Sequence, residues 1–513
     1  MNKTTYRLIL ALLLHQLKIF GQTPAFVTDS LDTYIKRNMA ASKIPGLAIA
    51  IVENGKVIVA KGYGLRQVGK SDSVDVNTLF YMASNTKLFT ATALASLADQ
   101  KKLSLDDKIL THLPDFALYD TLATKMATIR DLLANRLGVK SYEGDFVYWN
   151  SDYTMQDVMK NLRLVKPAGQ FRQDYSYSNA GFVTAGLVIP KVTGQSWNSY
   201  VDQTILKPLG MTNTYLLTAN YAKRKNIAYG YTNCCTSGGE LMQVAFDNLD
   251  NLGPAGGMVS SVNDISKWLI MQLDSGRYEG KRILPYSVLE ATRRASTIIT
   301  YKKHPIAPFT YEFYCLGIGL FDYQHMDVYS HAGGAFGFHT NVTFVPSRKL
   351  GIVVLINQDN SNFHESLRFQ ILDAYAKAPY EDKNAYFYER SLRRDKKQSQ
   401  DIKELENRVA KNNQPPMPLS AYTGTYRNPL YGTIRIEVAP ESKSKNSLLI
   451  HFQHHPDLTA RLDYMDKDEF RITFSNPRFG IAPALFSTQN GKGVSVDVKA
   501  TDFVDFEPYR FTR

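Results

Sequence analysis

The sequence predicts an α+β protein in which an antiparallel sheet is flanked by helices and carries a helical subdomain, followed by a small all-β barrel. Two features of the 513-residue chain support this prediction. Residues 23–378 begin with a helix and a hairpin and end with further strands and a helix, with a long helical stretch between them. In residues 419–513, short segments alternate apolar and polar residues, the pattern of strands that bury one face.

The first part of the sheet is expected near the N-terminus. Residues 26–42 carry apolar side chains at helical spacing. The apolar runs 47–52 and 56–60 flank Asn54-Gly55, which is the strongest short signal for a hairpin. An Ala- and Leu-rich segment without Gly or Pro then predicts a buried helix over about 84–99.

The middle of the chain is mostly helical, and strands return only after it. Residues 100–165 form a helical insert, in which Thr128 and Asp131 have the spacing of a capping box. A helix at about 362–376 closes the unit. The returning strands are expected at 328–330, 338–344 and 352–356. The sheet is therefore expected to be split across the sequence.

The chain changes character after the last of these helices. Residues 379–418 are rich in Tyr and Arg, then charged, and end in a Pro-rich run, which predicts a helical linker with a stiff joint. From residue 419 the strands are short and separated by turn residues. An up-and-down barrel or a small sandwich is expected there.

The N-terminus has the features of a secretory signal peptide. Basic residues within 1–7 precede a short apolar run at 8–14, and Gly21 offers a small residue before a cleavage point. The apolar run is far shorter than the ~20 residues that span a bilayer. We therefore expect residues 1–22 to be removed, leaving a periplasmic or secreted protein without a stable membrane anchor.

Composition excludes several classes of function. The net charge of +12 is spread over several patches without a nucleic-acid-binding motif, so we expect a solvated basic surface and no nucleic-acid partner. Three cysteines are too few for a disulfide framework; Cys315 either bridges to Cys234 or Cys235, or the thiols stay unpaired and buried. The adjacent His454-His455 is expected on the surface. No metal-ligand spacing appears, and we expect neither a metal nor a cofactor.

Candidate chemistry begins at Ser84 and Lys87. Ser84 falls at the start of the predicted helix, where free backbone N–H groups and the helix dipole favour negative charge. Lys87, three residues further on, lies over the same face and can take the hydroxyl proton. A second Ser-x-x-Lys, at Ser442 and Lys445, sits in a polar turn without an apolar helix behind it, and we interpret it as a solvated loop.

A Ser–Lys pair also needs an acid or base for the leaving group, and Tyr177 is the candidate. Tyr177 and Asn179 form a Tyr-x-Asn motif between a Pro/Gly turn and a small-residue helix, at a junction of elements. The same spacing starts at Tyr148 and at Tyr231, but these two lie in loops. Tyr177 is therefore preferred.

The third motif is His331-Ala-Gly333-Gly334, which follows a predicted strand. Glycines at this position would let a substrate approach the strand edge, where backbone groups can bind it. A single strand histidine is more often structural, and the glycines after it favour the functional interpretation.

In this order and at these separations, the three motifs resemble those of the serine β-lactamase and penicillin-binding protein superfamily. The similar branch contains class C β-lactamases, D-Ala-D-Ala carboxypeptidases, D-aminopeptidases and related esterases. Pro208-Leu-Gly-Met211 and Gly256-Gly257 also look like that branch, so the resemblance covers about residues 25–376. It implies a β-lactamase/transpeptidase-like fold. The tail from Tyr422 onward resembles the lipocalin-like β-domain appended to such hydrolases.

The resemblance implies a serine hydrolase that forms an acyl-enzyme on Ser84. Lys87 and Tyr177 would share the work of general base and general acid. Asn179 would orient Lys87 and the substrate amide.

The resemblance also implies that His331, Gly333 and Gly334 bind substrate, with the backbone N–H groups of Ser84 and Gly334 forming the oxyanion hole. Class C β-lactamases carry Lys where this chain has His331. A histidine with an ordinary pKa near ~6.5 predicts a weaker, pH-dependent hold on a substrate carboxylate. Many relatives also have His-x-Ser-Gly where this chain reads Asn135-Arg-Leu-Gly138.

The leading expectation is an exported hydrolase of a peptide, amide or ester, acting on a small-molecule or peptide substrate. Three alternatives stay open: a class C-like β-lactamase, a penicillin-binding sensor that is acylated without turnover, and a scaffold whose β-tail binds an apolar ligand. The sequence specifies neither the substrate nor the oligomeric state.

Overall fold

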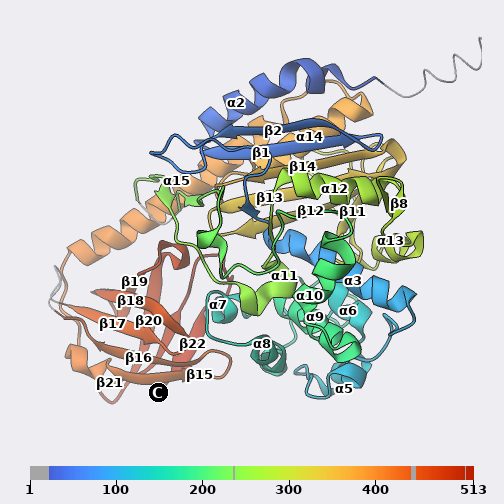
Figure 1. Cartoon of the computed structure of the whole chain (residues 1–513). Coiled ribbons are helices and arrows are strands. Elements are labelled where there is room, and N and C mark those ends of the chain that lie inside the picture. The colour runs from blue at the N-terminus through green and yellow to red at the C-terminus, as the bar shows by residue number, and fades with distance from the viewer. Residues whose placement is uncertain (1–21, 235–236, 441–445, 503) are drawn as a thin grey trace, which may run out of the picture.

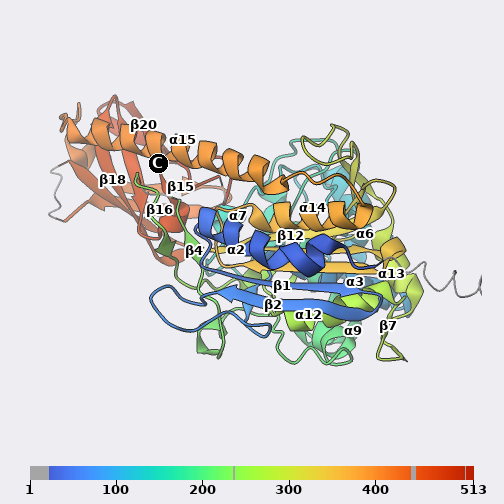
Figure 2. The same cartoon turned by 90° about the horizontal axis from the view of Figure 1, so that it is seen from above.

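The computed structural model describes residues 22–513 except 235–236, 441–445 and 503. It contains an α+β sandwich and a closed β-barrel, linked by helix α15 (Lys383–Ala410). Figures 1 and 2 show α15 running from beside the sandwich to the barrel. The predicted fold class is confirmed. The proposed signal peptide and the second Ser-x-x-Lys lie outside the described residues.

An eight-stranded antiparallel sheet forms the centre of the sandwich, in the order β2-β1-β14-β13-β12-β11-β10-β9. Its strands are β1 (Gly46–Glu53), β2 (Lys56–Gly64), β9 (Thr297–Thr300), β10 (Glu312–Tyr314), β11 (Gly319–Asp322), β12 (Asp327–Ala335), β13 (Phe338–Val345) and β14 (Leu350–Ile356). The N-terminal hairpin joins the later strands through β1 and β14, where Ala50 lies opposite Val353. The sheet is thus split across the sequence, as predicted. The edge strands β9 to β11 were not predicted.

Both faces of the sheet are covered by helices. Helices α2 (Leu31–Ala41) and α14 (Phe363–Ala376) lie over one face, and α12 (Val262–Leu273) packs on β1 and β14 from the other (Figure 2). Alternate residues of β1 therefore enter two separate cores: Leu47, Ile49 and Ile51 in one, and Ala48, Ala50 and Val52 in the other. This explains why residues 47–52 are all apolar.

The helical layer below the sheet carries the candidate site. Besides α12, its helices are α3 (Thr86–Asp99), α4 (Ile109–His112), α5 (Thr121–Met126), α6 (Ile129–Leu133), α7 (Asp145–Tyr148), α8 (Met155–Asn161), α9 (Asn179–Thr193), α10 (Trp197–Val201), α11 (Gly253–Gly256) and α13 (Tyr286–Arg293). The capping box predicted at Thr128 and Asp131 is present at the start of α6. Short two-stranded ladders join β3 (Phe80–Tyr81) to β6 (Val259–Ser260), β4 (Tyr231–Thr232) to β5 (Met242–Gln243), and β7 (Arg277–Tyr278) to β8 (Lys281–Arg282).

The C-terminal strands close into an up-and-down barrel, the first of the two architectures expected there. They are β15 (Gly424–Asn428), β16 (Gly432–Val438), β17 (Ser447–Phe452), β18 (His455–Asp466), β19 (Glu469–Phe474), β20 (Ile481–Gln489), β21 (Lys492–Val498) and β22 (Tyr509–Thr512). Buried aromatic side chains fill its interior, among them Tyr426, Tyr431, Phe452, Phe470, Phe474 and Phe486.

One end of the barrel is occupied by the sandwich. Phe146 of α7 is fully buried, and its ring stacks on Tyr431 and His455, with centroids 5.5 and 5.6 Å away. His455, expected on the surface, is buried there, because its Nδ1 meets the Tyr431 hydroxyl at 2.6 Å and its Nε2 meets the Trp149 carbonyl at 2.9 Å. That prediction was wrong. The two parts of the chain therefore interlock through shared aromatic packing.

Arg478, between β19 and β20, anchors the barrel to the sandwich at a second point. Its side chain is buried, forms an ion pair with Asp359 at 3.1 Å and lies over the ring of Phe336. A buried charge of this kind is stable only when paired, so the contact ties the barrel to the loop that follows β14.

The bridge considered between Cys315 and Cys234 or Cys235 is not formed. Cys315 is a buried free thiol whose Sγ lies 3.2 Å from the carbonyl of Arg293. In the part of the chain that the structure describes, no helix is both long and apolar enough to span a membrane. The same residues contain no cluster of three or more side chains suited to hold a metal ion.

Candidate active site

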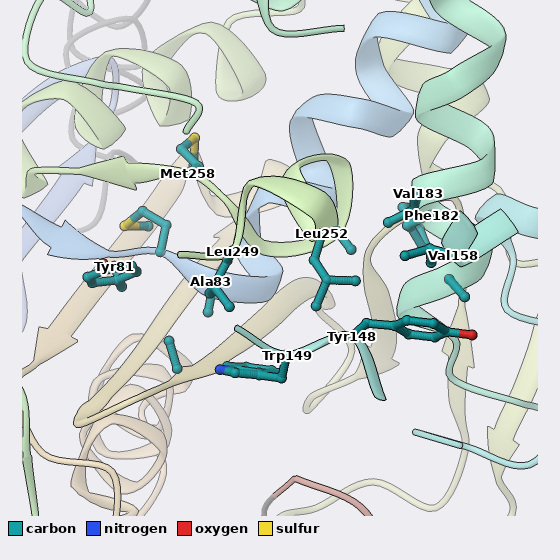
Figure 3. Close-up of a cluster of buried hydrophobic side chains, with 14 of the residues drawn as sticks. Tyr81, Ala83, Tyr148, Trp149, Val158, Phe182, Val183, Leu249, Leu252 and Met258 are labelled. Carbon is teal, nitrogen blue, oxygen red and sulfur yellow. The ribbon is translucent and has the colours of Figure 1, made fainter. Parts of the chain in front are cut away.

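Ser84 stands in a tight turn between β3 and α3. The turn, Ala83–Asn85, is a single 3₁₀ turn, and Ala83 adopts a φ of 47° in the left-handed region that non-glycine residues avoid. Figure 3 shows Ala83 in the same cluster of buried hydrophobic side chains as Leu249, Leu252 and Trp149. The Asn85 amide donates to Thr340 Oγ1 of β13 at 2.9 Å and pins the turn to the sheet.

Lys87 is completely buried beneath Ser84. Its Nζ lies 2.6 Å from Asn179 Oδ1, 2.8 Å from the Ala255 carbonyl and 3.2 Å from Ser84 Oγ. Burial lowers the pKa of Lys87 from 10.5 to about 7, while the nearby carboxyl of Asp145 acts in the opposite direction. A large share of the amine is therefore neutral at physiological pH and can accept a proton.

Tyr177 approaches the same pair from the other side. The Lys87 Nζ lies 4.7 Å from the centroid of its ring, and its phenol is hydrogen-bonded to Ser84. Burial raises the pKa of Tyr177 well above 10, although the bond to Ser84 lowers it in part. The phenol is therefore protonated at neutral pH. The structure brings Tyr177, not Tyr148 or Tyr231, to Ser84.

Asn135 holds the turn that presents Tyr177. Its carbonyl accepts the N–H of Ser176 at 2.8 Å, and its side-chain Oδ1 accepts the N–H of Ser178 at 3.1 Å. The two bonds bracket Tyr177 in the chain. The segment 135–138, which departs from the motif of many relatives, thus still supports this flank of the site.

His331 lies on β12 and uses both ring nitrogens within the protein. Nδ1 lies 2.6 Å from the Ala332 carbonyl and so carries the proton, which leaves Nε2 to accept from the Tyr314 hydroxyl at 3.0 Å. Burial, with Lys87 nearby, lowers the pKa of His331 to about 3. The pH-dependent hold on a carboxylate expected from the sequence is therefore absent, because the ring stays neutral through the physiological range.

Gly333, the first glycine after His331, is required for packing within the protein, and not only for the approach of a substrate. A Cβ on Gly333 would lie 2.3 Å from the Met82 carbonyl oxygen and 2.4 Å from Thr340 Oγ1. Gly333 is thus required because β12 packs directly against the segment that leads to Ser84. Gly334 lines the cleft together with Ser84.

The cleft above Ser84 has a volume of about 440 Å³. It brings together all the predicted site residues that face it: Ser84, Tyr177, Asn179, His331, Gly333 and Gly334. Among the lining residues that were not predicted as site residues are Asp145, Glu312, Tyr314, Asp502 and Phe506. Asp145 had a signal, since it is a carboxyl inside an aromatic run. Asp502 and Phe506 had none, because they belong to the distant β-tail.

The cleft contains carboxyl groups, and burial raises the pKa of two of them, Asp145 and Glu312. Among the described residues that line it, none is a lysine or an arginine, whereas Asp145, Glu312 and Asp502 contribute carboxyl groups. Burial raises the pKa of Glu312 to about 7. Lys87 is not among the lining residues, and its Nζ has its partners within the protein.

A sheet split around a helical layer, with Ser84, Lys87 and Tyr177 converging on one cleft, defines a protein of the β-lactamase-fold class of serine hydrolases. The chain belongs to the Beta-lactamase family, whose model matches residues 31–376. Residues 408–513 match a domain of unknown function (DUF3471).

Curated relatives cover much of the chain at low identity. The chain is 27% identical to "Unguisins hydrolase ungD" of Aspergillus violaceofuscus over 88% of its own length and 85% of that protein. It is 30% identical to "Protein flp" of Staphylococcus aureus, over 64% of its own length and 63% of the relative. The octameric penicillin-binding protein homologue from Pyrococcus abyssi superposes with a TM-score of 0.60 at 22% identity, covering 95% of this chain and 100% of the other. That likeness concerns the fold alone.

Proposed function

We propose that this protein is a serine hydrolase that forms an acyl-enzyme on Ser84 and acts on peptide, amide or ester substrates. One observation carries the proposal. The Nζ of Lys87, with a pKa lowered to about 7 by burial, lies 3.2 Å from Ser84 Oγ. A buried neutral amine beside a hydroxyl at a strained turn is the arrangement that activates a serine nucleophile.

The proposed reaction follows from the contacts. Ser84 Oγ attacks the substrate carbonyl while its proton passes to neutral Lys87. Tyr177, hydrogen-bonded to Ser84, delivers a proton to the leaving group and recovers one from Lys87. The backbone N–H groups of Ser84 and Gly334 would hold the oxyanion. A water molecule then cleaves the acyl ester, with the same groups acting in reverse, and releases the acid and free Ser84.

The ionisable groups of the cleft favour substrates without a carboxylate over substrates that carry one. A β-lactam or a C-terminal peptide presents a carboxylate, which needs a cation. Here His331 is neutral, with a pKa lowered to about 3, and the described lining residues include no lysine or arginine. We therefore rank esters, amides and internal peptide bonds above β-lactams as substrates.

The β-lactamase and the penicillin-binding sensor can be distinguished from this hydrolase by the experiment described below, and the ligand-binding barrel loses support. A β-lactamase would turn over nitrocefin, and a sensor would be acylated without release. Ligand binding inside the barrel is disfavoured because aromatic side chains fill the interior and Phe146 occupies one end.

The experiment is labelling and turnover with a matched variant. Purified protein and Ser84→Ala are treated with a fluorophosphonate and a fluorescent penicillin, and the modified peptide is identified by mass spectrometry. Hydrolysis of a neutral p-nitrophenyl ester, D-amino-acid amides and nitrocefin is measured in parallel. We expect labelling only at Ser84 and turnover of the neutral substrates. Undiminished labelling in Ser84→Ala would show that another residue is the nucleophile.

We further propose that the protein is exported to the periplasm or secreted, on the basis of the N-terminal sequence. Cell fractionation and the N-terminal mass of the mature protein test this. A chain that retains Met1 and stays in the cytoplasm would contradict it.

A further inference from the structure

A line of three polar side chains runs back from Lys87 into the protein. Lys87 Nζ lies 2.6 Å from Asn179 Oδ1, and Asn179 Nδ2 donates to Asp145 Oδ2, also at 2.6 Å. All three residues are buried. The function proposed above uses Lys87 but gives no role to Asp145.

The contacts of Lys87 determine where its lone pair points. A neutral amine has two N–H donors and one lone pair. The Ala255 carbonyl and Asn179 Oδ1 can only accept, so they take the two N–H groups at 2.8 and 2.6 Å. The lone pair is then left for the hydroxyl proton of Ser84, 3.2 Å away. This is the orientation that a general base requires.

That orientation depends on which end of the Asn179 amide faces Lys87. If the amide were turned over, Nδ2 would point at Nζ and donate to the lone pair, and Lys87 could no longer take a proton from Ser84. Asp145 opposes this, because its Oδ2 accepts from Nδ2. Burial raises the pKa of Asp145 well above its usual value, and a neutral carboxyl still offers an acceptor oxygen to the amide. A short buried bond of this kind makes the turned-over amide unfavourable.

Asp145 is in turn held by the barrel. The N–H of Gly144 lies 3.2 Å from Asp505 Oδ2 and 3.1 Å from the Tyr509 hydroxyl. The Tyr509 hydroxyl also donates to the Asp505 carboxyl at 2.5 Å. On the other side of Asp145, Phe146 is packed among aromatic residues of the barrel. Both chain neighbours of Asp145 are thus fixed by a part of the protein outside the sandwich.

We propose that Asp145 is a positioning residue that orients the Asn179 amide so that the lone pair of Lys87 faces Ser84, and that the barrel keeps Asp145 in place. The proposal rests on the function proposed above. It gives the C-terminal barrel a role in the reaction, because without Asp505 and Tyr509 the one-turn helix α7 would lose the contacts that fix its start.

The first test compares two replacements of nearly equal size. Asp145→Leu leaves Asn179 Nδ2 without an acceptor, so we expect the second-order rate of fluorophosphonate labelling to fall about 10²-fold. Asp145→Asn keeps an acceptor oxygen and should recover about tenfold of this loss. In both variants the final stoichiometry should stay at one label per chain, since a positioning role lowers the rate and not the number of folded sites. Equal rates in wild type and Asp145→Leu, or a loss of stoichiometry with an unchanged rate, would overturn the proposal.

The second test addresses the barrel. Tyr509→Phe removes one of the two acceptors of the Gly144 N–H, and we expect about a three- to tenfold slower labelling. The matched control is Tyr426→Phe, which removes another buried barrel hydroxyl, one that bonds to the Tyr422 and Gly493 carbonyls and to Arg513. This control should leave the rate unchanged.

A double-mutant cycle decides whether the two effects share one route. If Tyr509 acts through Asp145, Tyr509→Phe should have no further effect in the Asp145→Leu background. Multiplicative losses would overturn the role of the barrel. Ser84→Ala separates the two levels of failure: labelling that does not depend on Ser84 refutes the proposed function, whereas Ser84-dependent labelling that is insensitive to Asp145 refutes only this inference.

Discussion

The acid limb of the pH–rate profile tests the central contact of the site. Only the neutral amine of Lys87 can accept the Ser84 proton, so kcat/KM should follow the deprotonation of Lys87. An ordinary lysine with a pKa of 10.5 would be neutral in only about 0.03% of molecules at pH 7. With its pKa lowered to about 7 by burial, Lys87 is neutral in about half of them.

The same numbers give the expected size of the effect. The neutral fraction is about 9% at pH 6 and about 91% at pH 8, so kcat/KM for a neutral ester should rise about tenfold between them. Two other groups of the cleft do not add to the limb. His331 stays neutral because its pKa is lowered to about 3, and Tyr177 stays protonated because its pKa is raised well above 10.

Two carboxyl groups of the cleft could imitate this result: burial raises the pKa of Glu312 to about 7 and that of Asp145 well above its usual value. The assay is therefore run on wild type, Glu312→Gln and Asp145→Asn, with p-nitrophenyl ester hydrolysis from pH 5.5 to 9. A limb that persists in both Glu312→Gln and Asp145→Asn belongs to Lys87. A flat profile from pH 6 to 8, or a midpoint above pH 9, would refute the assignment of Lys87 as a buried neutral base.

Three further changes have defined outcomes. Tyr177→Phe should lower kcat ~10²–10⁴-fold by removing the phenol proton, while Tyr148→Phe and Tyr231→Phe stay near wild type in the ester assay; a larger loss in either would reassign the motif. Phe146→Ala should lower the free energy of unfolding by about 3–5 kcal/mol in urea denaturation, and an unchanged midpoint would show that the barrel end does not depend on this ring. His331→Lys should raise the kcat/KM ratio of carboxylate-bearing over neutral substrates at pH 7.5, and an unchanged ratio would show that this position does not meet the substrate carboxylate.

Much of the fold could be predicted because its elements carry local signals. The hairpin has its Asn54-Gly55 turn, and α3 is apolar on all sides because it is buried on all sides. The barrel strands alternate with period two. By contrast, β9 to β11 are only three or four residues long and gain their structure from pairing with β12 and with one another, which no local pattern records.

Site residues were predicted where they lie on helices or strands that have a local sequence signal. They were missed where only tertiary packing brings them to the cleft. Ser84 and Lys87 share a helix start, so their spacing alone places them together. Phe506 reaches the cleft only because the barrel docks on the sandwich. The ionisation of His331 could not be predicted from its residue type either, since burial and the Tyr314 hydroxyl determine it.

The contact between Gly144 and the barrel has a consequence for the order in which the protein is made. The two acceptors of the Gly144 N–H lie 361 and 365 residues further along the chain. A ribosome therefore completes the Ser84 turn, Lys87 and Tyr177 long before it adds the residues that hold α7. Domains generally fold as they emerge, N-terminal part first. On the roles proposed above, the Ser84 turn would be made before the residues that hold α7, and the contacts that position Lys87 would be complete only once the barrel has docked.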